Sequence, residues 1–358
     1  MTEGLPSFYS HTVAKRKRKK SLSIPLIVII ALVAAAVFIL TPTEDPRMKE
    51  VTISSEEGFF SLEELELLAI PSFGKGEIIE HTGYTLSYAE EFEQPWWVAY
   101  VLTPWEAVTK VIDRADNFRA DGAVSTGSAT LADYKGSGYD RGHMAPFADL
   151  SWSEESASDS FYLSNMSPQA GDLNRYAWAD LEAVVRTFSL SGPVCVVTGP
   201  VLTDGPYKSI GENKVAVPNY YYKVIFSPAL NSAIAFVMPN SKCLGSLKDY
   251  AVTVDYVEEL TGIDFFYLLE DIYEEQLEST INTDLWDFRT YSSTVAAEYG
   301  SDGTWTEETK LEVKKTVYTE EETLSADLTL QVILYEYFGE TKRDITEAFS
   351  SIVLLFNN

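Results

Sequence analysis

Short β-like segments and two longer helical segments share the middle of this chain, and their order limits the folds that it can adopt. Residues 84–88 alternate in polarity, and residues 96–102 are rich in aromatic and β-branched side chains, so we predict a β-hairpin there. Strands and helices do not follow a strict β–α–β alternation, which favours an α+β fold with a central antiparallel sheet and flanking helices. Further strands are predicted at residues 161–163, 194–199, 219–226 and 233–238, and helices at residues 173–190 and 248–260, the second ending near Gly262.

The size and charge of the chain limit the classes of protein to which it can belong. With 358 residues, of which 46% are hydrophobic, the chain can bury a substantial core, and it is not a disordered protein. Its formal net charge is −27, whereas proteins that bind nucleic acid mainly by electrostatic contact usually present a basic face. The excess of acidic residues argues against tight, extended binding to a duplex, although a few arginines around a metal ion could still hold one phosphate.

Cysteine use excludes two kinds of stabilising framework. The chain has two cysteines, Cys195 and Cys243, which are too few for a disulfide framework or a zinc cage. Cys195 lies in the apolar run 194–197, so we expect it to be a small buried hydrophobe. If the domain lies outside the cytoplasm, a disulfide bond between the two cysteines is the alternative.

The N-terminus carries basic residues that are followed by an apolar segment. Residues 15–20 read KRKRKK, and residues 24–40 form a run of 17 residues without a charge. We therefore predict a cytoplasmic basic tail at residues 1–20 and a transmembrane helix at residues 21–41, which makes the chain a single-pass protein of the cell membrane with its bulk outside the cytoplasm. A cleaved signal peptide is the alternative, but no small-x-small cleavage pattern follows Leu40.

The rest of the sequence divides into three predicted regions. Residues 42–77 are acidic and predict a tether, which contains a short amphipathic helix at residues 61–70. Residues 78–280 contain the predicted sheet and helices and form the main domain. Residues 290–358 differ in composition and carry no catalytic motif, so they predict a small C-terminal module whose role the sequence does not define.

One of the three histidines of the chain, His143, stands in the segment DRGHMAP at residues 140–146. Histidine is the side chain that exchanges protons near neutral pH, so His143 is a candidate catalyst. Arg141 projects to the same side as His143 if the segment is extended, where it could contact a phosphate. The alternative for Arg141 is an ion pair with Asp140 or Asp149.

Asn174 and Glu182 lie in the second candidate segment, the predicted helix at residues 173–190. Eight residues on an α-helix correspond to about 80° around the axis and about two turns along it, so both side chains can face one site. An amide oxygen is a hard, neutral ligand suited to Mg²⁺, and a nearby carboxylate can orient the water molecules that the ion keeps. Without such a site, Asn174 would be an ordinary helix N-cap and Glu182 part of a solvated helix face.

These residues together resemble the DNA/RNA non-specific endonuclease family, the ββα-metal nucleases with a D-R-G-H motif. The resemblance covers roughly residues 78–270. It implies a ββα-metal active-site motif within the α+β fold and a hydrated Mg²⁺ ion that Mn²⁺ could replace. The residues that carry it are those of the D-R-G-H segment, followed by Asn165, Pro168, Gln169, Asn174, Leu181 and Glu182.

The resemblance also implies a role for each candidate residue. His143 is the expected general base, and Asn174 is the expected lone direct protein ligand of the metal ion. Glu182 is expected to orient metal-bound water, and Arg141 is expected to stabilise the phosphate side. Asn165 is expected to support substrate or metal geometry. The family has a further arginine upstream, which corresponds to Arg114 or, as the alternative, to Arg119.

The function expected from this resemblance is a membrane-anchored, metal-dependent endonuclease that hydrolyses phosphodiester bonds of DNA and RNA with little sequence specificity. The alternative is a catalytically inactive nuclease-like scaffold that acts as a cell-envelope binding protein; the acidic charge favours it and the complete motif disfavours it. A phosphodiesterase for other substrates would use the same residues. Some members of the family dimerise, so a homodimer stays open.

Overall fold

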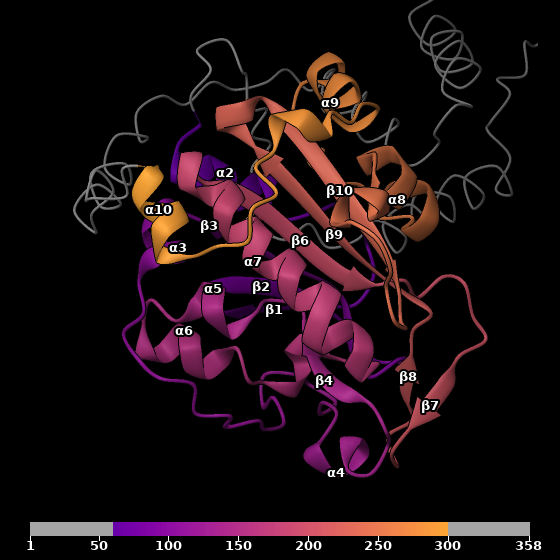
Figure 1. Ribbon diagram of the computed structural model, residues 1–358. Helices are drawn as coiled ribbons and strands as arrows, with labels where there is room; N and C mark the ends of the chain where they lie inside the picture. Colours follow the sequence, from indigo (N-terminus) through magenta and orange to yellow (C-terminus); the bar gives the residue numbers. More distant parts are fainter. Residues whose placement is uncertain (1–59, 300–358) are drawn as a thin grey trace, which may run out of the picture. The chain divides into compact units, whose positions relative to one another are not determined.

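A seven-stranded antiparallel sheet forms the centre of the computed structural model, which describes residues 60–299 (Figure 1). Its strand order is β1-β2-β3-β6-β9-β10-β11, and all neighbouring strands are antiparallel. The predicted α+β fold with a central antiparallel sheet and flanking helices is therefore confirmed. The strands are β1 (Glu77–His81), β2 (Tyr84–Ala89), β3 (Gln94–Leu102), β6 (Val194–Pro200), β9 (Tyr220–Ser227), β10 (Ser232–Pro239) and β11 (Ala251–Val252).

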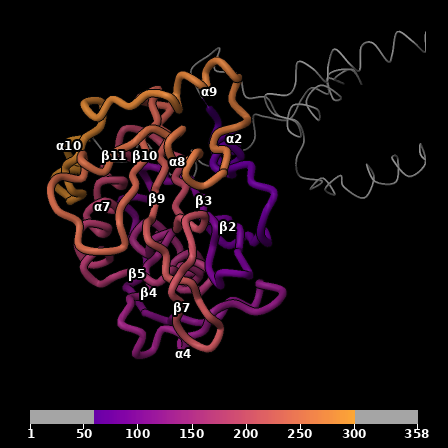
Figure 2. Tube along the Cα trace, turned by 90° about the vertical axis from the view of Figure 1, so that its right-hand side faces the viewer, coloured from indigo at the N-terminus to yellow at the C-terminus, as the bar shows by residue number. Residues whose placement is uncertain are grey.

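Helices cover both faces of the sheet, and the alternation of side chains along β9 shows which residues each face buries. On one face lies α7 (Trp178–Phe188), whose Trp178 is fully buried with its ring 5.7 Å from that of Tyr221. On the other face, the ring of Phe226 lies 5.4 Å from that of Phe266. Helix α2 (Leu62–Leu68) packs on the same face as Phe266, and Figure 2 shows α2 and α7 on opposite sides of the strands.

The predicted hairpin and most of the predicted elements are present. Strands β2 and β3 pair with each other, and the helix predicted in the tether is α2, which Ser61 caps with a full capping box. Helix α8 (Val254–Thr261) ends at Gly262, which has φ of 70°. Residues outside 60–299 include the predicted transmembrane helix at 21–41 and most of the C-terminal module. Within 60–299, no helix has the length and apolar character that crossing a membrane requires.

Two of the predicted elements were wrong in type or extent. Residues 161–163 do not form a strand; Tyr162 makes one isolated bridge with Arg119, and the chain then enters a short turn of 3₁₀ helix, η1 (Leu163–Asn165). The helix predicted from residue 248 begins only at Val254. Thr253 caps it, because its side chain accepts the amide hydrogen of Tyr256.

A separate pair of short strands leads into α7 and forms a ββα unit. Strand β4 (Asp140–His143) pairs antiparallel with β5 (Met166–Gln169), and α7 follows after η2 (Leu173–Ala177). Gly142 permits this pairing at close range, because a Cβ at that position would lie 2.2 Å from the side-chain oxygen of Gln169. The four residues of the D-R-G-H segment thus form a β-strand, and its glycine allows the close approach of the partner strand.

The smaller elements connect these units. Both cysteines are free; Cys195 is fully buried, as predicted, and donates to the carbonyl oxygen of Leu65 at 3.3 Å. The other helices and strands are α3 (Pro104–Val108), α4 (Leu131–Tyr134), α5 (Phe147–Leu150), α6 (Glu154–Asp159), η3 (Ser189–Ser191), β7 (Lys208–Ile210), β8 (Val215–Val217), η4 (Pro228–Leu230), η5 (Leu247–Tyr250), α9 (Asp271–Glu278), η6 (Thr283–Leu285) and α10 (Ser293–Glu298).

Candidate active site

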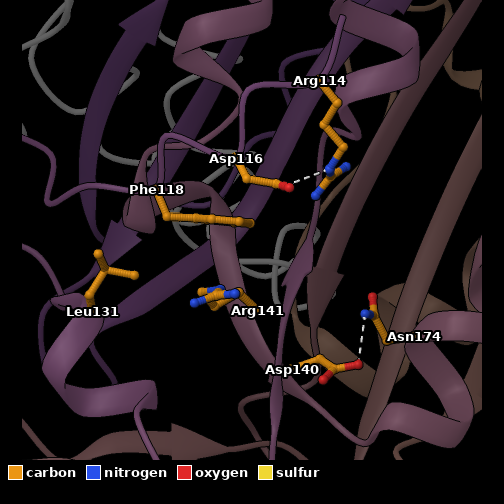
Figure 3. A pocket seen from close by; sticks show the side chains of 7 residues that line it. All are labelled: Arg114, Asp116, Phe118, Leu131, Asp140, Arg141 and Asn174. Atoms are coloured by element: carbon orange, nitrogen blue, oxygen red, sulfur yellow. Dashed lines mark hydrogen bonds and ion pairs between the residues drawn. The ribbon is translucent and has the colours of Figure 1, made fainter.

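An open cavity of about 380 Å³ lies beside β4 and the start of the α7 helix (Figure 3). Three of the residues predicted from the sequence line it, although they come from three separate parts of the chain: Arg114, Arg141 and Asn174. Two carboxylates and two apolar side chains complete the lining: Asp116, Asp140, Phe118 and Leu131.

His143 lies next to this cavity, packed between two aromatic rings. Its ring centroid is 5.6 Å from that of Phe118, which lines the cavity, and 5.5 Å from that of Phe161. The side chain is 7% exposed, and its Nε2 atom is buried without a hydrogen-bond partner. Burial, with the nearby positive charges of Arg114 and Arg141, lowers the pKa of His143 to about 3. The imidazole is therefore neutral at pH 7, as a general base must be.

The same two rings hold the arginines. The guanidinium carbon of Arg141 lies 4.2 Å from the ring centroid of Phe118, and that of Arg114 lies 5.1 Å from the ring centroid of Phe161. Nε of Arg114 also donates to Asp116 at 2.7 Å. Phe118 and Phe161 thus fix two cations and an imidazole in one place.

Arg119, the alternative to Arg114, is held elsewhere. Its guanidinium stacks on Tyr162 at 3.8 Å, and its Nη1 donates to the carbonyl oxygen of Ser158 at 2.8 Å. It does not line the cavity. Of the two arginines, the structure brings Arg114 to the site.

Asp140 orients the side chain of Asn174. The amide nitrogen of Asn174 donates to Asp140 Oδ2 at 3.1 Å, and Arg175 donates to both oxygens of the same carboxylate at 2.7 and 2.6 Å. Partial burial alone would raise the pKa of Asp140, but the hydrogen bonds from Arg175 and Asn174 outweigh it and keep the pKa below its usual value. Figure 3 shows the amide oxygen of Asn174 on the side opposite Asp140, where it is available to a ligand.

Asn174 is not an N-cap residue; it lies within η2, a single turn of π-helix. The amide of Trp178 bonds to the carbonyl oxygen of Leu173, five residues earlier, instead of four as in an α-helix. The turn directly precedes α7, so Asn174 departs from the regular α-helical spacing of the residues that follow it. Such π turns occur often at functional sites.

Glu182 does not line the cavity; it lies near a group of buried charges. Lys223 on β9 is fully buried, donates to Thr198 Oγ1 at 2.6 Å and lies 5.2 Å from the ring centroid of Trp178. Burial raises the pKa of Glu182 and lowers that of Lys223, while the attraction between the two opposes both shifts. The group also contains Asp149, whose carboxylate accepts hydrogen bonds from Tyr100 and Arg186 at 2.8 Å each.

Comparison with known proteins identifies the family of this chain. The profile described as DNA/RNA non-specific endonuclease matches residues 64–271. Human (Homo sapiens) mitochondrial Endonuclease G is 36% identical over 209 residues, which cover 54% of this chain and 70% of the human protein. Nuclease C1 of Cunninghamella echinulata var. echinulata is 36% identical over 212 residues, which cover 54% and 84% of the two chains. The chain belongs to the DNA/RNA non-specific endonuclease family.

A solved structure supports the family fold. The crystal structure of the EndoG/EndoGI complex, whose title concerns EndoG inhibition, contains a chain that is similar with a TM-score of 0.54 and 32% identity. The match covers 58% of this chain and 91% of that one. As a member of this endonuclease family, the protein is an endonuclease, and all the candidate site residues lie within the span that the family profile matches.

Asn165 takes a different place from the other candidates of this endonuclease. It is fully buried, and its amide exchanges two hydrogen bonds of 2.9 Å with the backbone of Ala145 and donates a third to Ser160, also at 2.9 Å. The side chain therefore holds the backbone just after His143 and does not line the cavity.

Sequence reasoning missed Lys223 and the orienting contact of Asp140. A lysine in the middle of the otherwise uncharged strand Tyr220–Ser227 was the available signal for Lys223, because an isolated charge in such a strand must find a buried partner.

Proposed function

We propose that this endonuclease hydrolyses phosphodiester bonds of DNA and RNA with little sequence specificity, with His143 as general base and Asn174 as the protein ligand of a hydrated Mg²⁺ ion. The observation that carries the proposal is that two arginines and an oriented amide oxygen line one open cavity, and that a neutral imidazole without a hydrogen-bond partner among the described residues packs against its wall. Each of these groups has a distinct part in the hydrolysis of a phosphodiester.

His143 is suited to take a proton from the attacking water. A base must be unprotonated at the working pH, and burial beside two guanidinium groups holds His143 in that form. Nε2 has no hydrogen-bond partner within the described residues, so no group of the protein occupies the lone pair that a base needs in the tautomer with the proton on Nδ1. The two hydrogen bonds between Asn165 and the backbone of Ala145 fix the segment that follows His143 and so help to hold the imidazole in position.

Asn174 fits the chemistry of a Mg²⁺ ligand. The ion accepts hard oxygen ligands and commonly takes few of them from the protein, and Asp140 leaves the amide oxygen of Asn174 free for that purpose. When bound, the ion would offset charge on the phosphate and polarise it for attack. Glu182, half-buried on the same helix, is proposed to orient the water molecules around it.

Arg114 and Arg141 are proposed to bind the phosphate. Guanidinium groups match the geometry of phosphate oxygens, and the aromatic rings beneath them limit the side-chain freedom that binding would otherwise remove. This local pair of cations makes phosphate binding compatible with a net charge of −27, because the contact requires guanidinium groups at the phosphate and not a positive protein.

The test is a nuclease assay on plasmid DNA and on RNA with wild-type protein and His143→Ala, with Mg²⁺ and with chelator. We expect His143→Ala to lose about 10²- to 10⁴-fold in rate, the usual contribution of a general base. His81→Asn is the matched control, because His81 bonds to Asp121 at 2.8 Å and does not line the cavity. Full activity of folded His143→Ala, or of wild-type protein in chelator, would contradict the proposal.

We further propose that residues 21–41 anchor the endonuclease in the cell membrane with residues 1–20 in the cytoplasm. Support comes from the basic segment KRKRKK and the 17 uncharged residues that follow it. Protease added to intact cells should degrade the nuclease domain while a tag at residue 1 stays protected. Protection of both ends, or release of the protein without detergent, would contradict this topology.

A further inference from the structure

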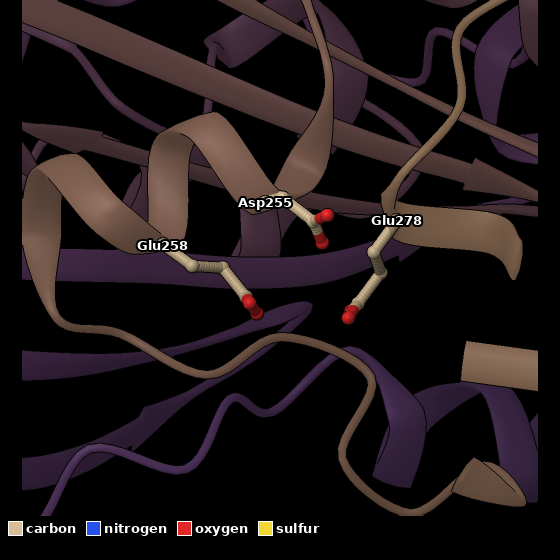
Figure 4. Close-up of side chains that lie close together, drawn as sticks. All are labelled: Asp255, Glu258 and Glu278. Atoms are coloured by element: carbon tan, nitrogen blue, oxygen red, sulfur yellow. The ribbon is translucent and has the colours of Figure 1, made fainter. Parts of the chain in front are cut away.

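Three carboxylates meet between α8 and α9, away from the cavity described above. Asp255 and Glu258 lie three positions apart on α8, so they share one face of the helix, and Glu278 is the last residue of α9. One oxygen from each carboxylate lies within 4.8 Å of one from each of the other two. Figure 4 shows the side chains of Glu258 and Glu278 directed toward each other, with Asp255 beside them.

Glu278 makes this group more than a set of surface acids. It is 5% exposed, and its Oε1 atom is buried with no hydrogen-bond partner. A buried carboxylate without a partner is strongly unfavourable unless it binds a proton or a cation. Glu278 therefore indicates that something positive belongs at this position.

The charges around the three carboxylates are all negative. Burial, followed by repulsion from neighbouring carboxylates, raises the pKa of Glu278 to about 10 and that of Glu258 to about 7, and the pKa of Asp255 is raised for the same reasons. One hydrogen bond, from the amide of Phe265 to Glu258 at 2.8 Å, partly offsets the effect. No lysine, arginine or histidine of the described residues 60–299 contributes to any of these shifts.

We propose that Asp255, Glu258 and Glu278 form a binding site for a hard divalent cation, with Ca²⁺ as the representative ion, separate from the catalytic metal. Carboxylate oxygens are the ligands that such cations select, and Ca²⁺ accepts them in flexible geometry with water in the remaining positions. One ion would pair with all three carboxylates at once and give Oε1 of Glu278 its partner. A shared proton would serve only two of them.

The position of the site defines what the ion does. Helix α9 begins at Asp271, where the match to the endonuclease family ends, and it packs against β10. A cation held by two residues of α8 and one of α9 links the family domain to the segment that follows it. The ion is thus a structural clamp, and it takes no part in the chemistry at His143.

The experiment measures thermal unfolding of the full-length chain carrying Asn174→Ala, which removes the proposed catalytic ligand and leaves the three carboxylates intact. After treatment with chelator, Ca²⁺ is added in steps. We expect Tm to rise over a range of roughly 0.1–1 mM Ca²⁺, the weaker end of the affinities of Ca²⁺ sites in proteins. Binding should also release protons, since the ion displaces them from carboxylates of raised pKa, and calorimetry in buffers of different ionisation enthalpy detects that release.

Variants assign the effect to these residues. In the same background, Glu278→Gln and the exposed Asp255→Asn should each abolish the Ca²⁺-dependent rise in Tm, while Glu259→Gln, an equal charge change at an exposed neighbour on α8, should retain it. With Asn174 restored, Glu278→Gln should keep the Mg²⁺-dependent nuclease rate. An absent Ca²⁺ response in the parent, or a response that persists in both site variants, would overturn the proposal.

Discussion

Two groups of polar and charged residues lie near the α7 helix, and they differ in solvent access. The open group lines the cavity, where water and a substrate can reach it. The buried group packs against the sheet, where its members interact with one another and with the hydroxyl groups of Tyr100 and Thr198. The open group is Arg114, Arg141, Asp140 and Asn174, and the buried group is Glu182, Lys223, Asp149 and Arg186.

The difference teaches how similar side chains serve different purposes in one site. Exposed charges are screened by water, so removing one changes contact with a substrate more than it changes folding. Buried charges are not screened, so removing one leaves its partner uncompensated. We therefore expect variants of the open group to alter activity and variants of the buried group to alter stability first.

The largest effect on stability is expected for Lys223→Met. Lys223 is fully buried and supplies positive charge opposite Glu182, so its loss should reduce the free energy of unfolding by about 3–5 kcal/mol. Urea denaturation measures this. Adding Glu182→Gln should recover part of the loss, whereas Thr198→Val, which removes only the hydrogen bond to Lys223, should cost about 1 kcal/mol. If the losses of Lys223→Met and Glu182→Gln simply add, the two charges are not coupled.

A smaller effect, on metal dependence, is expected for Asp140→Ala. Without Asp140 the amide of Asn174 loses the contact that orients it, so the Mg²⁺ concentration for half-maximal rate should rise about 10- to 100-fold with little change in Tm. Asp116→Ala is the matched control, since Asp116 lines the same cavity and contacts Arg114 instead. An equal Mg²⁺ shift in both variants would remove the special role of Asp140.

The pH dependence follows from the pKa of His143. Because that pKa is lowered to about 3, the imidazole stays neutral from pH 7 to 5, and kcat/KM should show no decline near pH 6.5 from this residue. An ordinary histidine would lose about tenfold in activity one pH unit below its pKa. As pH falls, His143 is protonated in the unfolded chain before it is protonated in the folded chain. The contribution of His143 to the free energy of unfolding is therefore complete above about pH 6.5 and declines as pH falls toward 3. His143→Asn should flatten the dependence of Tm on pH between these values.

The smallest effect is expected for Arg175→Ala. Arg175 bonds to both oxygens of Asp140, but its side chain is 66% exposed, and such ion pairs contribute little. The nuclease rate should change by at most about fivefold. A rise in the Mg²⁺ requirement as large as that of Asp140→Ala would show that Asp140 acts through Arg175 and not through Asn174.

Local pattern predicted the fold well and long-range pairing poorly. The hairpin of β2 and β3, the strands β6, β9 and β10, and the helix around α7 follow from periodicity. The strand predicted at residues 161–163 was wrong, because three apolar residues do not show whether a partner strand exists. Tyr162 meets a single residue of a loop, so the backbone turns there.

The candidate site shows the same limit. His143, Arg141 and Asn174 could be selected by residue type and spacing, and the structure places them at one cavity or against its wall. The contact between Asp140 and Asn174 joins residues 34 positions apart, and no sequence period reports it. The burial of Lys223 likewise depends on the pairing of β6 with β9 beneath α7, which is a property of the assembled sheet.

The π turn of η2 has a consequence for the length of the chain. It contains one residue more than regular α-helical spacing requires. Deleting one residue between Asn174 and Trp178 would restore that spacing, but it would rotate the preceding segment by about 100° relative to α7. The sheet holds Trp178 in place, so Asn174 and the strand before it would turn away from the cavity. Insertions and deletions at this turn should therefore be tolerated less well than most substitutions, because the site depends on how many residues stand there.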